Sequence, residues 1–348
     1  MTKVVCRKSF LLSTSCMTTV AALLLLMARS ALADGPDPVG CVLTSGACVF
    51  ATQGAAGPLA PQDGGTGGNG NKADDFSLSV TGTQTYTNNQ LNSPVNATSL
   101  GGAGAQGSNQ PAGGSNESGA SGGVGGAGGN VTVNVGPGIT GIDGDNTVGI
   151  NAITINSLGG MGGATSKGNI DGLDGPPNGV GGNGGTVNAT LDGSFSTNWF
   201  RSGGIYSTGG VGGRGRDYST GLEAQGAPGA VGGNGGLVSV TFQNANAQTT
   251  NGWFGTYFMQ PAGQGGGGMQ VASQGGAGGQ GGTAESVDGA QGGNGGAGGT
   301  GQNVNVGLGA NTNFSQRWNE DAGLIVQSVG GKGGALSLIH ISEPTRPY

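Results

Sequence analysis

The stretch Gly122–Val135, GGVGGAGGNVTVNV, contains both features that decide the fold. In its second part, Val131–Val135, apolar and polar residues alternate. Successive side chains of a strand point to opposite faces, so the three valines share one face and Thr132 and Asn134 share the other. The first part, Gly122–Gly129, offers almost no side chain to bury. Such a segment cannot cover its own valines, which predicts that equivalent segments stack on one another.

Four further segments show the same alternation, each with three apolar residues, at intervals of 51 to 66 residues. They are Phe76–Val80, Val187–Leu191, Val238–Phe242 and Val304–Leu308. Most follow a Gly-rich run, and we expect the valines among them, such as Val133, Val187, Val240 and Val306, to point inward. Stacking in register would bury these positions as a continuous ladder.

A second motif, Ser-x-Gly-Gly, lies between these segments, usually after residues that favour strands. It occurs at Ser99, Ser157, Ser207 and Ser328, and the copy expected near residue 262 is degenerate. Each unit of about 55 residues therefore consists of a strand, a polar turn region, a second strand and a Gly-rich loop. We predict an all-β parallel β-solenoid, or β-helix, over residues 64–335, with Gly-rich loops that bulge from its corners. A disordered low-complexity chain and a β-sandwich are the alternatives.

Composition excludes other classes. The chain of 348 residues has 84 Gly, and only 9% of its residues are charged. Glycine disfavours helices, so a helix bundle is excluded. Collagen is excluded because there are 13 Pro and because Gly does not recur strictly at every third position. The net charge of −6 disfavours nucleic acid and anionic lipid as partners.

Residues 1–33 have the features of a secretory signal peptide. Lys3, Arg7 and Lys8 precede the apolar run Val20–Ala28, and Ala31-Leu32-Ala33 is a small-x-small site that predicts cleavage between Ala33 and Asp34. A transmembrane helix is the alternative, but nine apolar residues are too few to cross a bilayer.

The last residues, Leu336–Tyr348, differ in composition from all that precedes them. They lack Gly and contain His340, the one histidine of the chain. The string LSLIHISEPTRPY resembles the in-frame translation of a sequencing adapter. We therefore expect residues 336–348 to be an artefactual tail, with the natural C-terminal part of the gene product missing.

Residues 34–63 are expected to form an N-terminal linker or cap that holds a cysteine pair. In an exported protein Cys41 and Cys48 are predicted to form a disulfide. Free or metal-binding thiols are the alternative, although residues 34–335 contain no His or further Cys to complete a zinc site.

No catalytic, cofactor-binding or metal-binding residue is predicted. Asp143 and Asp145, and likewise Asp171 and Asp174, lie in Gly-rich turns that could hold Ca²⁺, but turn carboxylates of this kind usually bond their own backbone. Gly-x-Gly-x-x-Gly patterns arise by chance at this glycine content. Without a histidine before residue 336, a Ser-His-Asp triad is excluded. We expect the protein not to be an enzyme.

Aromatic residues gather in a few places, where they could form a strip that binds carbohydrate or a partner, or could fill the core beside glycines. They are Trp199, Phe200, Tyr206, Trp253, Phe254, Tyr257, Phe258, Phe314 and Trp318. We favour core filling.

The segment Gly323–Gly334, GLIVQSVGGKGG, resembles a recurring element of Gly-rich autotransporter passenger domains, and Ile155–Gly163 is a looser copy. The resemblance implies a fragment of a secreted stalk or adhesin at the cell surface, reached through the periplasm and outer membrane. Its partners would be a host or neighbouring cell surface, glycans included. It also implies a translocator β-barrel in the outer membrane, which is missing from this chain. Alternatives are a Gly-Gly-x repeat protein with a structural or host-interaction role, and a β-helical enzyme acting on polysaccharides.

Overall fold

The computed structural model describes residues 39–42, 48–61, 65–81, 95–108, 120–136, 142–144, 153–165, 179–197, 203–217, 226–249, 269–286, 291–316, 323–336 and 339–341. All of these belong to one compact unit, which spans Ala33–Tyr348. Within the described ranges, β-strands are the only regular secondary structure. In the same ranges no helix is long and apolar enough to cross a membrane. The predicted cleavage site, Ala33 and Asp34, lies outside the described residues.

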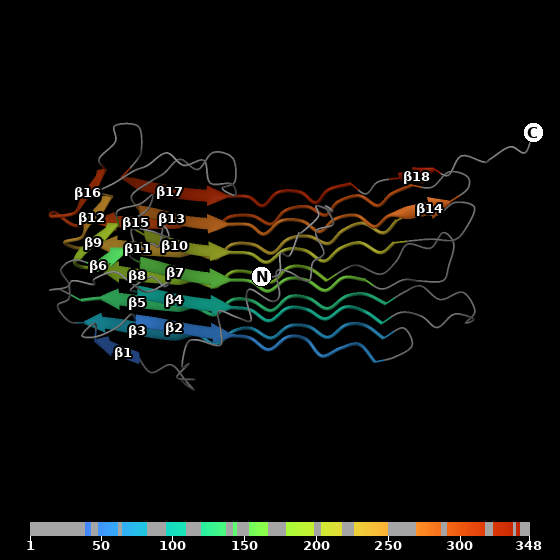
Figure 1. Ribbon diagram of the computed structural model, residues 1–348, viewed down its shortest axis with the longest axis horizontal. Coiled ribbons are helices and arrows are strands. Elements are labelled where there is room, and N and C mark those ends of the chain that lie inside the picture. The colour runs from blue at the N-terminus through green and yellow to red at the C-terminus, as the bar shows by residue number, and fades with distance from the viewer. Residues whose placement is uncertain are drawn as a thin grey trace, which may run out of the picture. The chain divides into compact units, whose positions relative to one another are not determined.

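Two parallel sheets of six strands each form the core of the fold (Figure 1). Sheet A consists, in spatial order, of β1 (Val39–Val42), β3 (Phe76–Thr81), β5 (Val131–Val135), β8 (Val187–Leu191), β11 (Val238–Phe242) and β15 (Val304–Leu308). Sheet B consists of β2 (Cys48–Gln53), β4 (Val95–Leu100), β7 (Ile153–Leu158), β10 (Gly203–Thr208), β13 (Met269–Gln274) and β17 (Leu324–Val329). The chain visits the two sheets alternately, and we number the resulting repeats 1 to 6. The topology is consistent with the expected parallel β-solenoid.

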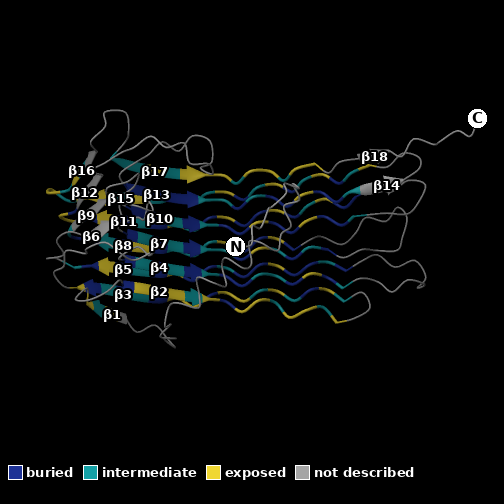
Figure 2. Cartoon of the chain, viewed as in Figure 1, coloured by how far each residue is buried: buried dark blue, intermediate teal, exposed yellow. Residues whose placement is uncertain are grey.

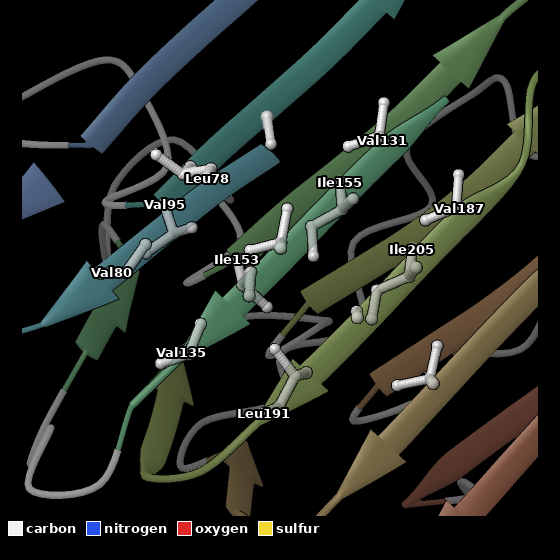
Figure 3. Packing of buried hydrophobic residues seen from close by; sticks show 14 of the residues in the cluster. Leu78, Val80, Val95, Val131, Val135, Ile153, Ile155, Val187, Leu191 and Ile205 are labelled. Carbon is white, nitrogen blue, oxygen red and sulfur yellow. The ribbon is translucent and has the colours of Figure 1, made fainter. Parts of the chain in front are cut away.

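The five alternating segments form β3, β5, β8, β11 and β15, as predicted, and pair in register. Val131 and Val187 are partners, and both are fully buried. Figure 3 shows apolar side chains of both sheets, such as Val135, Ile155 and Leu191, gathered in the space between them. Each such buried side chain contributes about 1.5–3 kcal/mol relative to exposure.

The expectation that Val306 is shielded is wrong. Val133, Val187 and Val240 are buried, but Val306 is only half-buried and Leu308 is 60% exposed. Both lie on β15, the last strand of sheet A, which has a neighbour on one side only.

The missing copy of the Ser-x-Gly-Gly motif lies at Ser273 rather than near residue 262. Ser273 pairs with Ser207 on one side and with Ser328 on the other. Even spacing misplaced it, because the repeat that contains β11 and β13 is longer than the others.

The first repeat begins before residue 64, where a linker or cap was expected. β1 pairs with β3, and β2 pairs with β4 in the register of the later repeats, with Thr52 opposite Ser99. The segment therefore supplies the first strand of each sheet.

Four short strands lie in the polar turn regions and form a third parallel sheet, which the sequence pattern does not predict. They are β6 (Ile142–Gly144), β9 (Ser194–Thr197), β12 (Asn246–Thr249) and β16 (Asn313–Gln316). A further pair, β14 (Ala284–Ser286) with β18 (Ile339–Ile341), brings in part of the tail that resembles an adapter.

The Gly-rich runs are ordered extended segments, which corrects the expectation of loops that bulge from the corners. In Figure 1 they continue from the strands side by side, as two series. Outgoing arms follow the strands of sheet B and comprise residues 54–61, 101–108, 159–165, 209–217, 275–283 and 330–335. Return arms lead into the next strand of sheet A and comprise residues 65–75, 120–130, 179–186, 226–237 and 291–303.

Candidate functional site

The arms have a period of three residues. Along 121–130 the glycine pairs are buried, whereas every third residue, namely Ser121, Val124, Ala127 and Asn130, is half-buried or exposed. The backbone hydrogen bonds have the same period. Gly101 N–H donates to the carbonyl of Leu158 at the end of β7, and Gly104 and Gly107 donate to Met161 and Ala164 in the next outgoing arm. Three residues per turn without internal hydrogen bonds is the geometry of a polyproline II helix.

Each Gly-Gly-x triplet uses its positions differently. The first glycine bonds to the next arm of the same series, as Gly125 N–H does to the Val180 carbonyl at 2.9 Å. The second bonds to the other series, as Gly126 N–H does to Gly102 at 2.7 Å. These second bonds continue from arm to arm through Gly160, Gly182, Gly210, Gly233, Gly276, Gly299 and Gly331. The arms therefore form two hydrogen-bonded layers.

Close packing of these layers explains the glycine content. A Cβ on Gly126 would collide with the carbonyl oxygen of Asn71, and one on Gly182 would collide with that of Gly126. Collagen needs one glycine per triplet because one position faces its axis. Here each arm has neighbours in its own layer and in the other layer, so glycine fills most of the first two positions of the triplets, with exceptions such as Ala105 and Ala230.

The serines of the Ser-x-Gly-Gly motif connect sheet B to the return arms. Ser207 Oγ donates to the Gly185 carbonyl at 2.7 Å and accepts a hydrogen bond from Gly236 N–H at 2.8 Å. Ser157 and Ser273 make the corresponding pairs of bonds. All three side chains are fully buried, so the motif is structural.

The third residue of each triplet forms columns that run across the repeats. In the return-arm layer Val124, Val180 and Val231 occupy one column and are 42%, 39% and 45% exposed. Met161 and Val211 are adjacent in the outgoing-arm layer, at 56% and 42%. Figure 2 shows these exposed positions recurring along the arms between buried ones. The surface of the arms is therefore a regular array with one side chain per triplet.

Asparagine side chains in the array accept hydrogen bonds from backbone N–H groups of the neighbouring arm. Asn183 Oδ1 accepts a hydrogen bond from Asn234 N–H, and Asn234 Oδ1 accepts one from Thr300 N–H, both at 2.8 Å. Asn69 does the same for Val124 at 2.9 Å. These bonds satisfy the N–H of the third position, which neither layer uses.

The first return arm ends in a small charged cluster. Asp75 accepts hydrogen bonds from the N–H and the side-chain amide of Asn130 and forms an ion pair of 2.7 Å with Lys72. Partial burial raises the pKa of Asp75. The interactions with Lys72 and Asn130 together lower it by more, so the pKa lies below its usual value. The carboxylate therefore stays ionised and holds repeats 1 and 2 together.

Two aromatic candidates lie in the described residues. Phe314 packs edge-to-face on Phe242, with 4.9 Å between ring centroids, which agrees with core filling. Tyr206 lies on the outer face of sheet B, where its hydroxyl donates to Gln270 Oε1 at 2.9 Å. Trp199, Phe200, Trp253, Phe254, Tyr257, Phe258 and Trp318 lie outside the described residues.

Sequence reasoning missed two buried polar side chains. Gln270, between Tyr206 and Gln327, is 1% exposed, and Arg216 is 2% exposed. Arg216 takes an interlayer position that is usually glycine, and burial lowers the pKa of its guanidinium. Only its place in the triplet, which the sequence did not reveal, distinguishes Arg216 from the exposed Arg214.

The remaining candidates do not converge on a chemical site. A disulfide joins Cys41 to Cys48, with 6.0 Å between their Cα atoms, and connects β1 to β2. Asp143 lies in β6, and Asp145, Asp171 and Asp174 lie outside the described residues. Within the described ranges no group of three His, Cys, Asp or Glu is placed to hold a metal ion.

Comparison with family models, curated proteins and solved structures gave no match for this chain. The columns on the glycine layers are the candidate functional surface, because they present exposed side chains in a regular array.

Proposed function

We propose that this chain is an exported, non-catalytic stalk or adhesin, built as a parallel β-solenoid and displayed at the cell surface. The observation that carries the proposal is the column of Val124, Val180 and Val231 on three adjacent return arms. Single exposed apolar residues are ordinary, whereas apolar residues aligned on neighbouring segments form a contact surface.

The stiffness of the layers supports the proposal. Glycine chains are flexible when free, but here the first two N–H groups of most triplets donate to a neighbouring arm, as Gly181 does to Val231 and Gly182 to Gly160. A surface held in this way loses little further entropy when it binds.

Repetition supports it as well. Contacts that are weak one at a time become strong when several side chains of one column engage the same surface, because each bound position raises the effective concentration of the next. The resemblance of Gly323–Gly334 to autotransporter passengers is in keeping with display on a host-facing or neighbour-facing surface, glycans included.

The test is retention of the purified full chain on immobilised cells and glycans. We expect each of Val124→Ser, Val180→Ser and Val231→Ser to weaken retention by less than about twofold, and the triple variant to weaken it by about tenfold or more. The matched control is Met161→Ser with Val211→Ser, on the other layer. Retention that is absent, or that falls equally for both column sets, contradicts the proposal.

A further inference from the structure

The charged cluster at the end of the first return arm holds an amine and a carboxamide on one carboxylate. Lys72 Nζ lies 2.7 Å from Asp75 Oδ1, and the side-chain nitrogen of Asn130 donates to Asp75 Oδ2 at 3.0 Å. The backbone N–H of Asn130 also donates to Oδ1, at 2.6 Å, and fixes the carboxylate against the second return arm. A nucleophilic group and an acyl group from two different repeats are therefore neighbours.

The oxygen of the same carboxamide is polarised by the third return arm. Asn130 Oδ1 accepts a hydrogen bond of 2.9 Å from the N–H of Thr186. A donor at this oxygen draws electrons away from Cγ, and it lies where negative charge develops when a nucleophile adds to that carbon. The Asn130 carboxamide is thus held at both ends, with its nitrogen on Asp75 and its oxygen on Thr186.

Asn183 shows that polarisation by a backbone N–H is not enough to make such a cluster. Its Oδ1 also accepts a hydrogen bond of this kind, from Asn234 N–H at 2.8 Å. In the preceding arm, however, Ala127 and Val124 stand where the cluster has its carboxylate and its amine. Asn183 therefore has the polarised oxygen without the reacting partners.

We propose that Lys72 and Asn130 join through an isopeptide bond, in a self-modification in which Asp75 transfers the proton. The Lys72 ammonium gives a proton to Asp75, and the nitrogen lone pair that this frees adds to Cγ of Asn130. The N–H of Thr186 stabilises the negative charge that develops on Oδ1.

The collapse of this intermediate completes the exchange of one amide for another. Asp75 passes its proton to Asn130 Nδ2, and the Cγ–Nδ2 bond breaks. The second proton that Lys72 Nζ sheds leaves with the ammonia, as ammonium. The net reaction converts a lysine ammonium and a primary amide into a secondary amide and an ammonium ion, and it needs no oxidant, reductant or other co-reactant.

The exposure of the cluster determines when the bond forms. The side chains of Lys72 and Asp75 are 52% and 46% exposed, so water stabilises the ammonium and the loss of its proton limits the rate. The intramolecular arrangement offsets this, because the reacting groups need not find each other in solution. The bond should therefore accumulate as the folded protein ages, and it closes a covalent loop from residue 72 to residue 130 between repeats 1 and 2.

The test is mass spectrometry of the purified full chain, freshly made and after prolonged incubation, with the disulfide reduced. After denaturation and digestion with thermolysin, the aged protein should give a branched peptide that joins Lys72 to Asn130 and is one ammonia lighter than its two parts. Trypsin should no longer cut after Lys72. A succinimide at an Asn-Gly pair such as Asn69-Gly70 also loses ammonia but forms no branch, so the branch is the decisive readout.

Three variants separate the chemistry from the ion pair. Lys72→Arg keeps the positive charge without an amine and should give no branch. Asp75→Asn keeps the shape of the side chain and should slow branching by about 100-fold or more, because it removes the group that carries the proton. Lys332→Arg, at the other lysine of the described residues, should branch at the rate of the parent.

The melting temperature gives a second readout. The aged parent should melt at a higher temperature than the fresh parent, because a covalent loop restricts the unfolded chain, whereas Lys72→Arg should show no such rise. Absence of the branched peptide from the aged parent, or equal branching in Asp75→Asn, would overturn the proposal. These readouts do not involve cells or glycans, so they stand apart from the proposed function.

Discussion

At the residue scale, glycine acts in this protein mainly through the side chain that it lacks. Among the described glycines only Gly193 has a positive φ, of 143°. Most of the others, such as Gly102 between Ala55 and Gly126, have backbone conformations open to other residues, but they leave no room for a Cβ. Their requirement is steric, and it depends on which arm lies next to them.

The buried serines lead to a matched prediction at this scale. Ser207→Ala would leave Gly236 N–H and the Gly185 carbonyl without their side-chain partner in a buried place, which should cost about 2–3 kcal/mol of unfolding free energy. Ser328→Ala, in the same motif but exposed, should change it by less than about 0.5 kcal/mol. Chemical denaturation measures the unfolding free energy of the two variants, and equal losses would contradict a structural role for the buried serines.

At the element scale, two periodicities meet where each return arm enters sheet A. The last triplet of the second return arm is Gly128-Gly129-Asn130, and its third residue, Asn130, is exposed. From Val131 onward burial alternates with a period of two. Asn130 suits this junction because its side chain bonds to Asp75 and its Oδ1 accepts a hydrogen bond from Thr186 N–H. One chain therefore changes from a helix with three residues per turn to a strand within a single residue.

Strand alternation predicts unequal effects for two adjacent positions of β11. Val240→Asp would bury an unpaired charge between the sheets, and we expect a loss of at least about 3 kcal/mol. Ser239→Asp, on the outer face, should change stability by less than about 1 kcal/mol. Thermal melting of the two variants is the measurement, and similar shifts would count against the alternation.

At the scale of the whole molecule, the sheets and the arm layers end together. β15, β17 and the arm 330–335 lie at one edge of the stack, and this edge leaves Leu308 and Val329 60% and 43% exposed. An uncovered strand edge invites pairing with another chain. Within the described residues, β15 and β17 therefore each have a strand neighbour on one side only.

The whole chain is also expected to lack catalytic turnover. Its one histidine, His340, lies in the tail that resembles an adapter, and groups that titrate near neutral pH are otherwise scarce. We predict no hydrolysis or elimination on pectin, peptidoglycan or peptide substrates. Product analysis after prolonged incubation is the check, and turnover that survives repurification would favour the polysaccharide-active alternative.

The sequence by itself determined the strands of sheet A other than β1, because alternation is a local property: the pleat of Val131–Val135 assigns each side chain to a face whatever lies beyond it. It also located most strands of sheet B through Ser-x-Gly-Gly, and it failed at Ser273, where the longer repeat broke the spacing.

Only the tertiary structure decided the state of the Gly-rich runs. A glycine pair looks the same in a loop, in a strand or in a polyproline II arm, because it has no side chain to pattern. What distinguishes Gly126 is a hydrogen bond to Gly102 and close contact with Asn71, a residue of the return arm that lies 55 positions earlier in the chain. For the same reason the half-burial of Val306 and the open space at Gly330 could not be predicted, since both depend on which neighbour is present rather than on the residue itself.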